Sequence, residues 1–427
     1  MSDETAAGAA EKGTKVSGLE VSASDRVILR ELAKKVDELA ARPIEQEKRE
    51  LWYAHNALKP TRPVIFCDPE NGWNEIITPD QIECEGQLAR GWEMYLRKTI
   101  FWGAEMCDDF VVSAEFRVPH VHTQTDYGLT ETYTQGRGGG SYVWDSPVKS
   151  YDDLDKLRFP AITVDHQATD DLVKLAQDTF EGILNVRLHT VWWWSFGMTW
   201  PAIRLRGLEQ MMLDMYDNPG LLHRLMAFLR DEMLHYLDWF EAEGLLPLNN
   251  EDDYVGSGSV GYTSELPRPE RPAGAPARVA DLWGLSESQE TVGVSPRMFE
   301  EFVFQYQEPI ISRFGLSYYG CCEPIDKRIK IIKRLPNLRR LSVSPWCNQE
   351  RMADELGRDY IFCRKPAPVL ISTAIWDEDL IRDDLRTTLR IARHCPLELV
   401  MKDVHTLAGQ PWRLGRWVQI AREVCAE

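Results

Sequence analysis

The sequence predicts an α/β fold, a (β/α)8 TIM barrel with an N-terminal helical extension and a long loop insertion. Short apolar runs rich in β-branched and aromatic residues alternate with helical patterns along most of the chain, and the connections between them are short. Repeated βα units of this kind form a parallel sheet, which a barrel closes on itself. The 427 residues, 44% of them hydrophobic, are enough for one large barrel with a sizeable core.

Residues 1–24 are predicted to be a disordered tail because they are small, polar and aperiodic. The barrel domain is predicted over residues 25–427. It begins with a helix that Ser24 can cap, in which apolar residues recur at helical spacing. The first strand is predicted at Val64–Cys67, and a polar, turn-rich loop follows it.

The remaining elements continue the alternation. Helices are predicted over about 80–104, 168–180, 201–242, 295–314, 326–336, 348–356, 379–393 and 412–427, and strands over 108–118, 184–196, 316–322, 338–344, 359–365 and 397–403. Residues 246–293 interrupt this rhythm, since they are too rich in Gly, Ser and Pro for a regular element. We interpret them as a long active-site loop or cover.

The charge balance excludes whole classes of partner. The chain has 49 Lys plus Arg against 67 Asp plus Glu, a net charge of −18, which disfavours nucleic acids and anionic membrane surfaces. No apolar run approaches the length of a membrane span, and the start lacks the pattern of a signal peptide. The nine cysteines do not form a secreted disulfide framework. A cytoplasmic protein with reduced thiols is therefore expected.

Catalytic groups of a parallel barrel lie where its strands end, so polar residues that follow apolar runs are candidates. Five groups meet this criterion: Asp68, Glu70 and Asn71; Glu115, Arg117, His120 and His122; Glu251, Asp252 and Asp253; Cys321, Cys322 and Glu323; and Lys402, Asp403 and His405.

Some of these side chains suit zinc. Thiolate, imidazole and carboxylate form a suitable ligand set, and a catalytic zinc takes three protein ligands. Cys321 or Cys322, His405 and Glu251 could supply them, and successive side chains of a strand alternate faces, so one of the two cysteines is expected to take part. The alternative is a pair of buried cysteines beside a hydrogen-bonded histidine.

A tryptophan cluster at Trp192, Trp193 and Trp194 has two interpretations. The rings could stack on a flat ligand or cofactor, or they could serve packing in the core. Alternate residues of a strand face opposite sides, so packing accounts for part of the cluster.

From about residue 50 to the C-terminus, the order of segments resembles the uroporphyrinogen decarboxylase superfamily, which includes corrinoid-dependent methyltransferases. The resemblance rests on FGMTWPAIRLRGLEQMMLDMYDNPGLLHRLMAFLRD, SPRMFEEFVFQY, YYGCCEP and DYIFCRKPAPVLI. The chain has CDPENGWNE where the haem-pathway decarboxylase has an arginine-rich segment resembling RQAGR. The resemblance therefore points to the methyltransferase branch.

In that branch zinc is held by an HxC motif and a later cysteine. Here the histidine position falls on Tyr319 or Gly320, and the last ligand would have to be His405, so the resemblance implies an altered ligand set. It implies transfer of a methyl group between a small O-, S- or N-methylated substrate and a corrinoid (cobalamin). The sequence has no DxHxxG corrinoid-binding loop, so the corrinoid is expected on a partner protein or free.

In the expected mechanism zinc polarises the substrate heteroatom, the tryptophans wall the pocket, and Glu70 with Asn71 positions the substrate or donates a proton. Without metal, Asp403 or Glu251 would act as the general acid.

Two alternatives stay open. One is cofactor-independent decarboxylation of a small acidic substrate, for which Arg117, Arg187, Arg204 and Arg364 are the candidate cations. The other is a non-catalytic barrel that binds a tetrapyrrole or a partner. The sequence leaves open the substrate, the direction of transfer, the role of the insertion and the oligomeric state, although the aromatic content suggests self-association.

Overall fold

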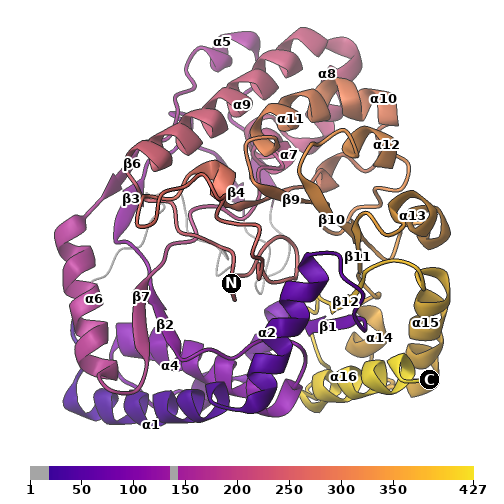
Figure 1. Cartoon of the computed structure of the whole chain (residues 1–427). Coiled ribbons are helices and arrows are strands. Elements are labelled where there is room, and N and C mark those ends of the chain that lie inside the picture. The colour runs from indigo at the N-terminus through magenta and orange to yellow at the C-terminus, as the bar shows by residue number, and fades with distance from the viewer. Residues whose placement is uncertain (1–18, 135–142) are drawn as a thin grey trace.

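The structure is a computed structural model that describes residues 19–134 and 143–427 (Figure 1). The predicted tail lies outside the described residues as far as residue 18, and the first helix begins at Ala23. The α-helices are α1 (Ala23–Ala40), α2 (Pro43–Asn56), α3 (Trp73–Ile76), α4 (Gln87–Phe101), α5 (Tyr151–Leu154), α6 (His166–Phe180), α7 (Thr199–Arg206), α8 (Leu208–Asp217), α9 (Pro219–Ala242), α10 (Pro296–Phe299), α11 (Gln305–Ile311), α12 (Ile329–Ile332), α13 (Gln349–Leu356), α14 (Val369–Ser372), α15 (Glu378–Ile391) and α16 (Trp412–Cys425).

A six-stranded parallel sheet forms the centre of the described fold, in the order β1-β12-β11-β10-β9-β8. Its strands are β1 (Val64–Cys67), β8 (Trp283–Ser286), β9 (Leu316–Tyr319), β10 (Leu338–Val343), β11 (Ile361–Arg364) and β12 (Leu397–Met401). Nearly every residue of these strands is buried, as expected for a parallel sheet covered on both faces. The predicted α/β class with a parallel sheet is confirmed.

The remaining strands pair in twos. β2 (Glu115–Val118) and β7 (Asn185–Leu188) pair in parallel and lie across the molecule from β9–β12 (Figure 1). Antiparallel pairs join β3 (His122–Gln124) with β6 (Ile162–Val164) and β4 (Thr132–Thr134) with β5 (Val143–Asp145).

The predicted closed barrel is not formed by strand ladders among the described residues. Single backbone hydrogen bonds join the two parallel sheets: Asp109 N–H donates to the Ile65 carbonyl of β1, and Phe196 N–H donates to the Leu285 carbonyl of β8, both at 2.8 Å. Asp109 precedes β2 and Phe196 follows β7, so the eight parallel strands follow one another in a ring. At two joints, between β1 and β2 and between β7 and β8, a single backbone hydrogen bond takes the place of a strand ladder.

Local chemistry explains where the helices begin and end. Ser22, rather than the predicted Ser24, caps α1, and its Oγ accepts from the Asp25 N–H at 3.1 Å. The predicted helical stretch over 201–242 is confirmed, but it divides into three helices, α7, α8 and α9. Gly207 has a φ of 92°, which ends α7, and Pro219 starts α9, since proline suits the first turn of a helix.

The predicted insertion 246–293 contains β8 and a segment that fills the ring of strands. Ser257 and Ser259 are completely buried, and Ser259 Oγ donates to Glu398 Oε2 in β12 at 2.7 Å. Asn56 Nδ2 in α2 donates to the Val260 carbonyl at 3.1 Å. The segment is therefore held on both sides, and the predicted loop over 246–293 also contains a strand, β8, that the prediction did not include.

We expect Gly256→Ala to lower the free energy of unfolding by about 2 kcal/mol or more. Gly256 has a φ of 75°, and an added Cβ would lie 1.7 Å from Tyr318 Cδ1 of β9. Gly182→Ala is the matched control, because Gly182 has a φ of 73° but no atom within 4 Å of the added Cβ. Gly182→Ala should lower the free energy of unfolding by about 1 kcal/mol, from backbone strain alone. Urea denaturation measures both, and equal losses would contradict the close approach.

Candidate active site

A cavity of about 330 Å³ lies between the two parallel sheets, where β1 and β8 face β2 and the segment after β7. Its walls are largely aromatic. Of the described residues that line it, nine carry aromatic rings: Trp73, Tyr95, Trp102, Phe110, Trp192, Trp193, Trp194, Tyr254 and Trp283. The size and the apolar walls suit a small organic ligand.

The aromatic walls are held in place by their own contacts. The indole N–H of Trp192 donates to the Leu245 carbonyl at 2.9 Å, that of Trp102 to Asp108 Oδ2 at 3.2 Å, and that of Trp283 to the Gly261 carbonyl at 2.9 Å. These three indole N–H groups are therefore not available to a ligand. One face of Trp102 is covered by Phe110, with ring centroids 4.4 Å apart, and the Arg340 guanidinium lies 5.1 Å from the centroid of the Trp283 ring.

The predicted tryptophan cluster thus has both roles that the sequence left open. Trp192, Trp193 and Trp194 all line the cavity. Trp192 also packs against Phe240, with ring centroids 4.7 Å apart, and Trp193 packs against Phe196 at 5.0 Å.

One side of the cavity carries a network of charged groups. Arg117 on β2 forms ion pairs with Asp252 and, at 3.1 Å, with Asp253. His189 Nε2 lies 3.2 Å from Asp253 Oδ1, and burial lowers the pKa of His189 to about 3, so the ring is neutral near pH 7. Burial raises the pKa of Asp253 to about 6, although Arg117 opposes that shift.

A second polar cluster lies behind the cavity, at the carboxyl ends of β1, β9, β11 and β12. Tyr254 connects the two, since its hydroxyl donates to Asp68 Oδ2 at 2.9 Å and both residues line the cavity. Burial lowers the pKa of Lys402, but Tyr254, Glu70 and other neighbours outweigh it and raise the pKa above its usual range. Lys402 forms an ion pair with Glu70, the predicted positioning or proton-donating residue.

The two adjacent cysteines lie within this second cluster. Their sulfur atoms are 3.3 Å apart, and Cys322 Sγ donates to Asp403 Oδ2 at 2.9 Å. The adjacent Cys322 sulfur lowers the pKa of Cys321, and the Lys365 and Lys402 ammonium groups lower it further, against the effect of burial. The surroundings of Cys321 therefore favour its thiolate form.

The predicted zinc ligands are not brought together. The cysteines lie beside Asp403, whereas His405 Nδ1 is paired with Asn71 Nδ2 at 3.0 Å. Within the part of the chain that the structure describes, no group of three or more His, Cys, Asp or Glu side chains is placed to hold a metal ion. The ammonium groups beside the thiols also disfavour a dication. The four residues do not fit one zinc site, and zinc binding stays a prediction.

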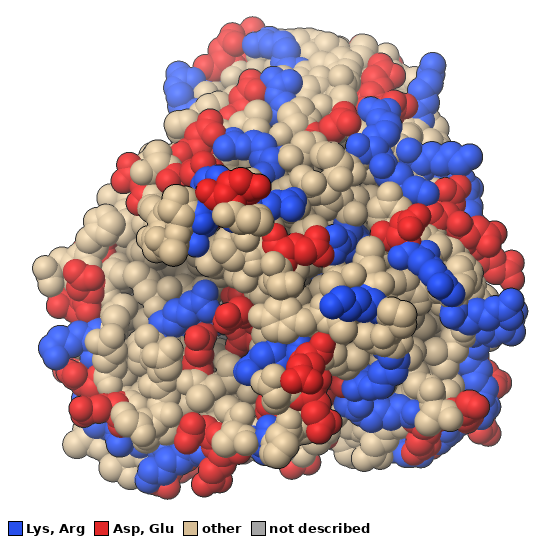
Figure 2. Space-filling model, in the orientation of Figure 1, with Lys and Arg blue, Asp and Glu red and all other residues tan. Residues whose placement is uncertain are grey.

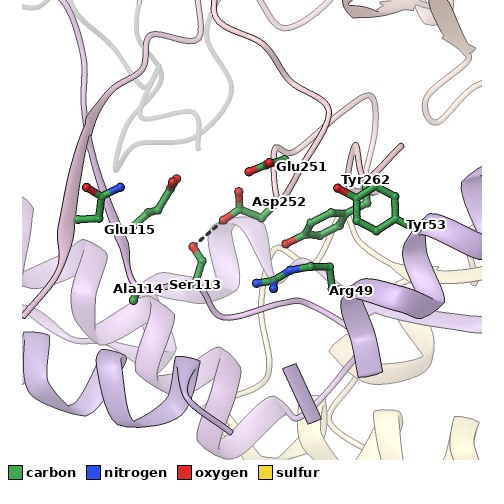
Figure 3. A pocket seen from close by; sticks show the side chains of 9 residues that line it. Arg49, Tyr53, Ser113, Ala114, Glu115, Glu251, Asp252 and Tyr262 are labelled. Carbon is green, nitrogen blue, oxygen red and sulfur yellow. Dashed lines mark hydrogen bonds between the residues drawn. The ribbon is translucent and has the colours of Figure 1, made fainter. Parts of the chain in front are cut away.

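Glu251 lines a different cavity, an open one of about 420 Å³ (Figure 3). In Figure 3 Asp252 lies between Glu251 and Glu115, and Arg49, Tyr53 and Tyr262 lie on the side of Glu251. Ser113 and Asp252 line both cavities, and Ser113 Oγ donates to Asp252 Oδ2 at 2.6 Å. The two cavities therefore adjoin at this pair of residues.

The arginines that decarboxylation would need are already occupied. Arg117 binds two aspartates, Arg187 binds Glu115 at 3.5 Å, and Arg364 binds Asp384 at 3.3 Å. Arg204 forms an ion pair with Glu131. An acidic substrate would have to compete with these carboxylates.

The sequence missed several residues of the site. Lys365 directly follows β11, so the strand-end criterion could have found it. His189 likewise follows β7. Ser257, whose Oγ donates to Cys321 Sγ at 3.1 Å, had no such signal because it lies in a Gly- and Ser-rich segment.

The chain matches no protein-family model and no curated protein. Among solved structures it is similar to a methyltransferase from Methanosarcina mazei, with a TM-score of 0.45 and 11% sequence identity over 88% of this chain and 97% of that chain. Similarity at this level assigns no function. Within the described ranges, no helix is long and apolar enough to cross a membrane.

We expect the Cys321 thiolate to form with a midpoint near pH 5, because the lysines and the Cys322 thiol stabilise it. The difference in ultraviolet thiolate absorbance between the wild-type protein and Cys321→Ser, followed over pH, measures this midpoint. Lys365→Met should raise this midpoint by about 1 pH unit, because the substitution removes one positive charge that stabilises the thiolate. A thiolate that appears only at the usual alkaline pH of a cysteine would contradict this account.

Proposed function

We propose that the protein is an enzyme that binds a small methylated substrate in the aromatic cavity and transfers its methyl group to a corrinoid that a partner protein presents. The observation that carries the proposal is the cavity itself, with its fixed aromatic walls and a reactive polar cluster behind it. The motifs that resemble the uroporphyrinogen decarboxylase superfamily support the methyltransferase branch. A cavity of about 330 Å³ holds a small molecule but not a corrin ring, so the corrinoid would approach from outside.

The residues of the chain have separate tasks in this proposal. The aromatic side chains that line the cavity bind the apolar part of the substrate and exclude water. Asp68 and Tyr254 supply a carboxylate and a phenol at the end of the cavity nearest the charged cluster. Because Lys402 and Glu70 lie directly behind Asp68, they set the charge at that end. Positioning of this kind supplies much of the rate enhancement of a bimolecular transfer.

The assay for this proposal follows methylation of chemically reduced cobalamin by its absorbance, with O-, S- and N-methylated compounds as donors. Trp192→Leu should lower kcat/KM by about tenfold or more, because the substrate would no longer be held in line with the acceptor. Trp412→Leu is the matched control, since Trp412 is half exposed and packs against Trp376 outside the cavity. Its activity should match that of the wild-type protein.

Two results would overturn the proposal. One is the absence of methyl transfer from every donor class. The other is release of carbon dioxide from a small acid, which would favour the decarboxylase alternative. If the first result is accompanied by tight corrinoid binding, it would identify a non-catalytic binding protein.

Elemental mass spectrometry tests the zinc prediction separately. The sequence predicts one zinc per chain, whereas the placement of the cysteines and His405 predicts less than one, with no further loss in Cys321→Ala, Cys322→Ala or His405→Ala. One zinc per chain that disappears in a cysteine variant and in His405→Ala would show that these residues come together as ligands.

A further inference from the structure

We infer that the substrate of the aromatic cavity is a small methylated onium compound, a quaternary ammonium or sulfonium ion. This inference rests on the proposed function for the fate of the methyl group, but binding of the cation can be tested without turnover. It follows from three features of the described residues: the aromatic walls, the charge of the lining and the separation of the predicted zinc ligands.

The walls suit a cation that has no N–H groups. An onium ion binds to the faces of aromatic rings, tryptophan best, through the ring quadrupole. The indole N–H groups of Trp102, Trp192 and Trp283 are all bound to protein acceptors, so these three residues of the lining offer a ligand no hydrogen-bond donor. The wall already accepts one ammonium group, since Lys98 Nζ lies 5.4 Å from the centroid of the Trp73 ring.

The charge of the lining also favours a cation. The described lining includes the carboxylates Asp68, Asp252 and Asp253 and the cations Lys98 and Arg117, which gives 2 − 3 = −1. Arg117 is held by two of these carboxylates, so it is a poor partner for an anionic substrate. Over longer range, the net charge of −18 attracts cations to the protein. On the face shown in Figure 2 the acidic side chains are spread among basic ones, so this attraction is not confined to one patch there.

The chemistry of an onium donor matches a site without an assembled zinc ligand set. When the methyl group leaves, the C–N or C–S bond breaks and its electron pair stays on nitrogen or sulfur. The product is a neutral amine or thioether, and the new bond to the methyl carbon uses the electron pair of the reduced corrinoid. No proton enters this balance. An ether or thioether donor would instead release an anion, which needs a metal or a general acid to stabilise it.

Binding of three probes of matched shape tests the inference by isothermal titration calorimetry. The probes are choline, its neutral isostere with a tert-butyl group in place of the trimethylammonium group, and a tert-butyl carboxylic acid of the same length. We expect choline to bind about tenfold tighter than the neutral isostere, and the anion to bind most weakly. Tetramethylammonium and trimethylsulfonium ions, titrated in the same way, distinguish the two onium classes by which binds tighter.

Variants of Trp192 connect the effect to the ring. Affinity for choline should fall in the order wild type, Trp192→Phe, Trp192→Leu, with a loss of about tenfold for leucine, whereas affinity for the neutral isostere should change little. Trp412→Leu should bind all probes as the wild-type protein does. The conservative Phe variant guards against misfolding, since it keeps an aromatic ring at the site.

The inference is overturned if the three probes bind equally, if the anion binds tightest, or if choline affinity is indifferent to Trp192. These failures differ from failure of the proposed function. Methyl transfer from an ether or thioether in a protein that does not bind choline would refute the onium substrate and leave methyl transfer standing. Tight, Trp192-dependent choline binding without methyl transfer from any onium donor would support the onium ligand and refute methyl transfer.

Discussion

Two buried ammonium groups organise the carboxyl edge of the parallel sheet. Lys365 follows β11 and is 1% exposed, and Lys402 follows β12 and is 6% exposed. A charge removed from water costs several kcal/mol unless other groups compensate it. The compensation comes from separate parts of the chain. Glu70 pairs with Lys402, while Lys365 Nζ donates to Ser257 Oγ at 2.5 Å and to the Cys321 carbonyl at 2.9 Å. The lysines therefore hold the ends of β1, β9, β11 and β12 and the 254–260 segment in one cluster.

This constraint also shapes the ligand cavity. Ser257 is held by Lys365, and the chain just before it supplies Tyr254 and Gly256 to the cavity wall. The opposite walls come from the two joints between the parallel sheets, where single backbone hydrogen bonds replace a strand ladder. A continuous ladder would bring β2 and β7 against β1 and β8 and leave less room between them. The two joints and the buried lysines together place the aromatic cavity beside the polar cluster, in which the charges are paired.

The sequence predicted the strands of the sheet well and the site in part. Apolar runs such as Val64–Cys67 and the polar residues after them were predictable because a buried parallel strand has few alternatives. β8 was missed, since a Gly-, Ser- and Pro-rich stretch hides its four residues. The structure does not bring Glu251 together with the cysteines and His405, as the predicted ligand set requires. Residues that follow different strands share an edge of the sheet, but their side-chain directions depend on loop conformations that one sequence does not reveal. Tyr254 and Ser257 illustrate this point, because they reach the site from within the insertion.

The central claim is that the aromatic cavity holds a methylated cation. Anomalous diffraction from crystals soaked with tetramethylarsonium, a heavy onium ion, tests it most directly. We expect a single arsenic peak between the sheets, within about 6 Å of the ring centroids of Trp102 and Trp192. A map with no peak in the cavity, or with peaks confined to the acidic surface, would contradict the account.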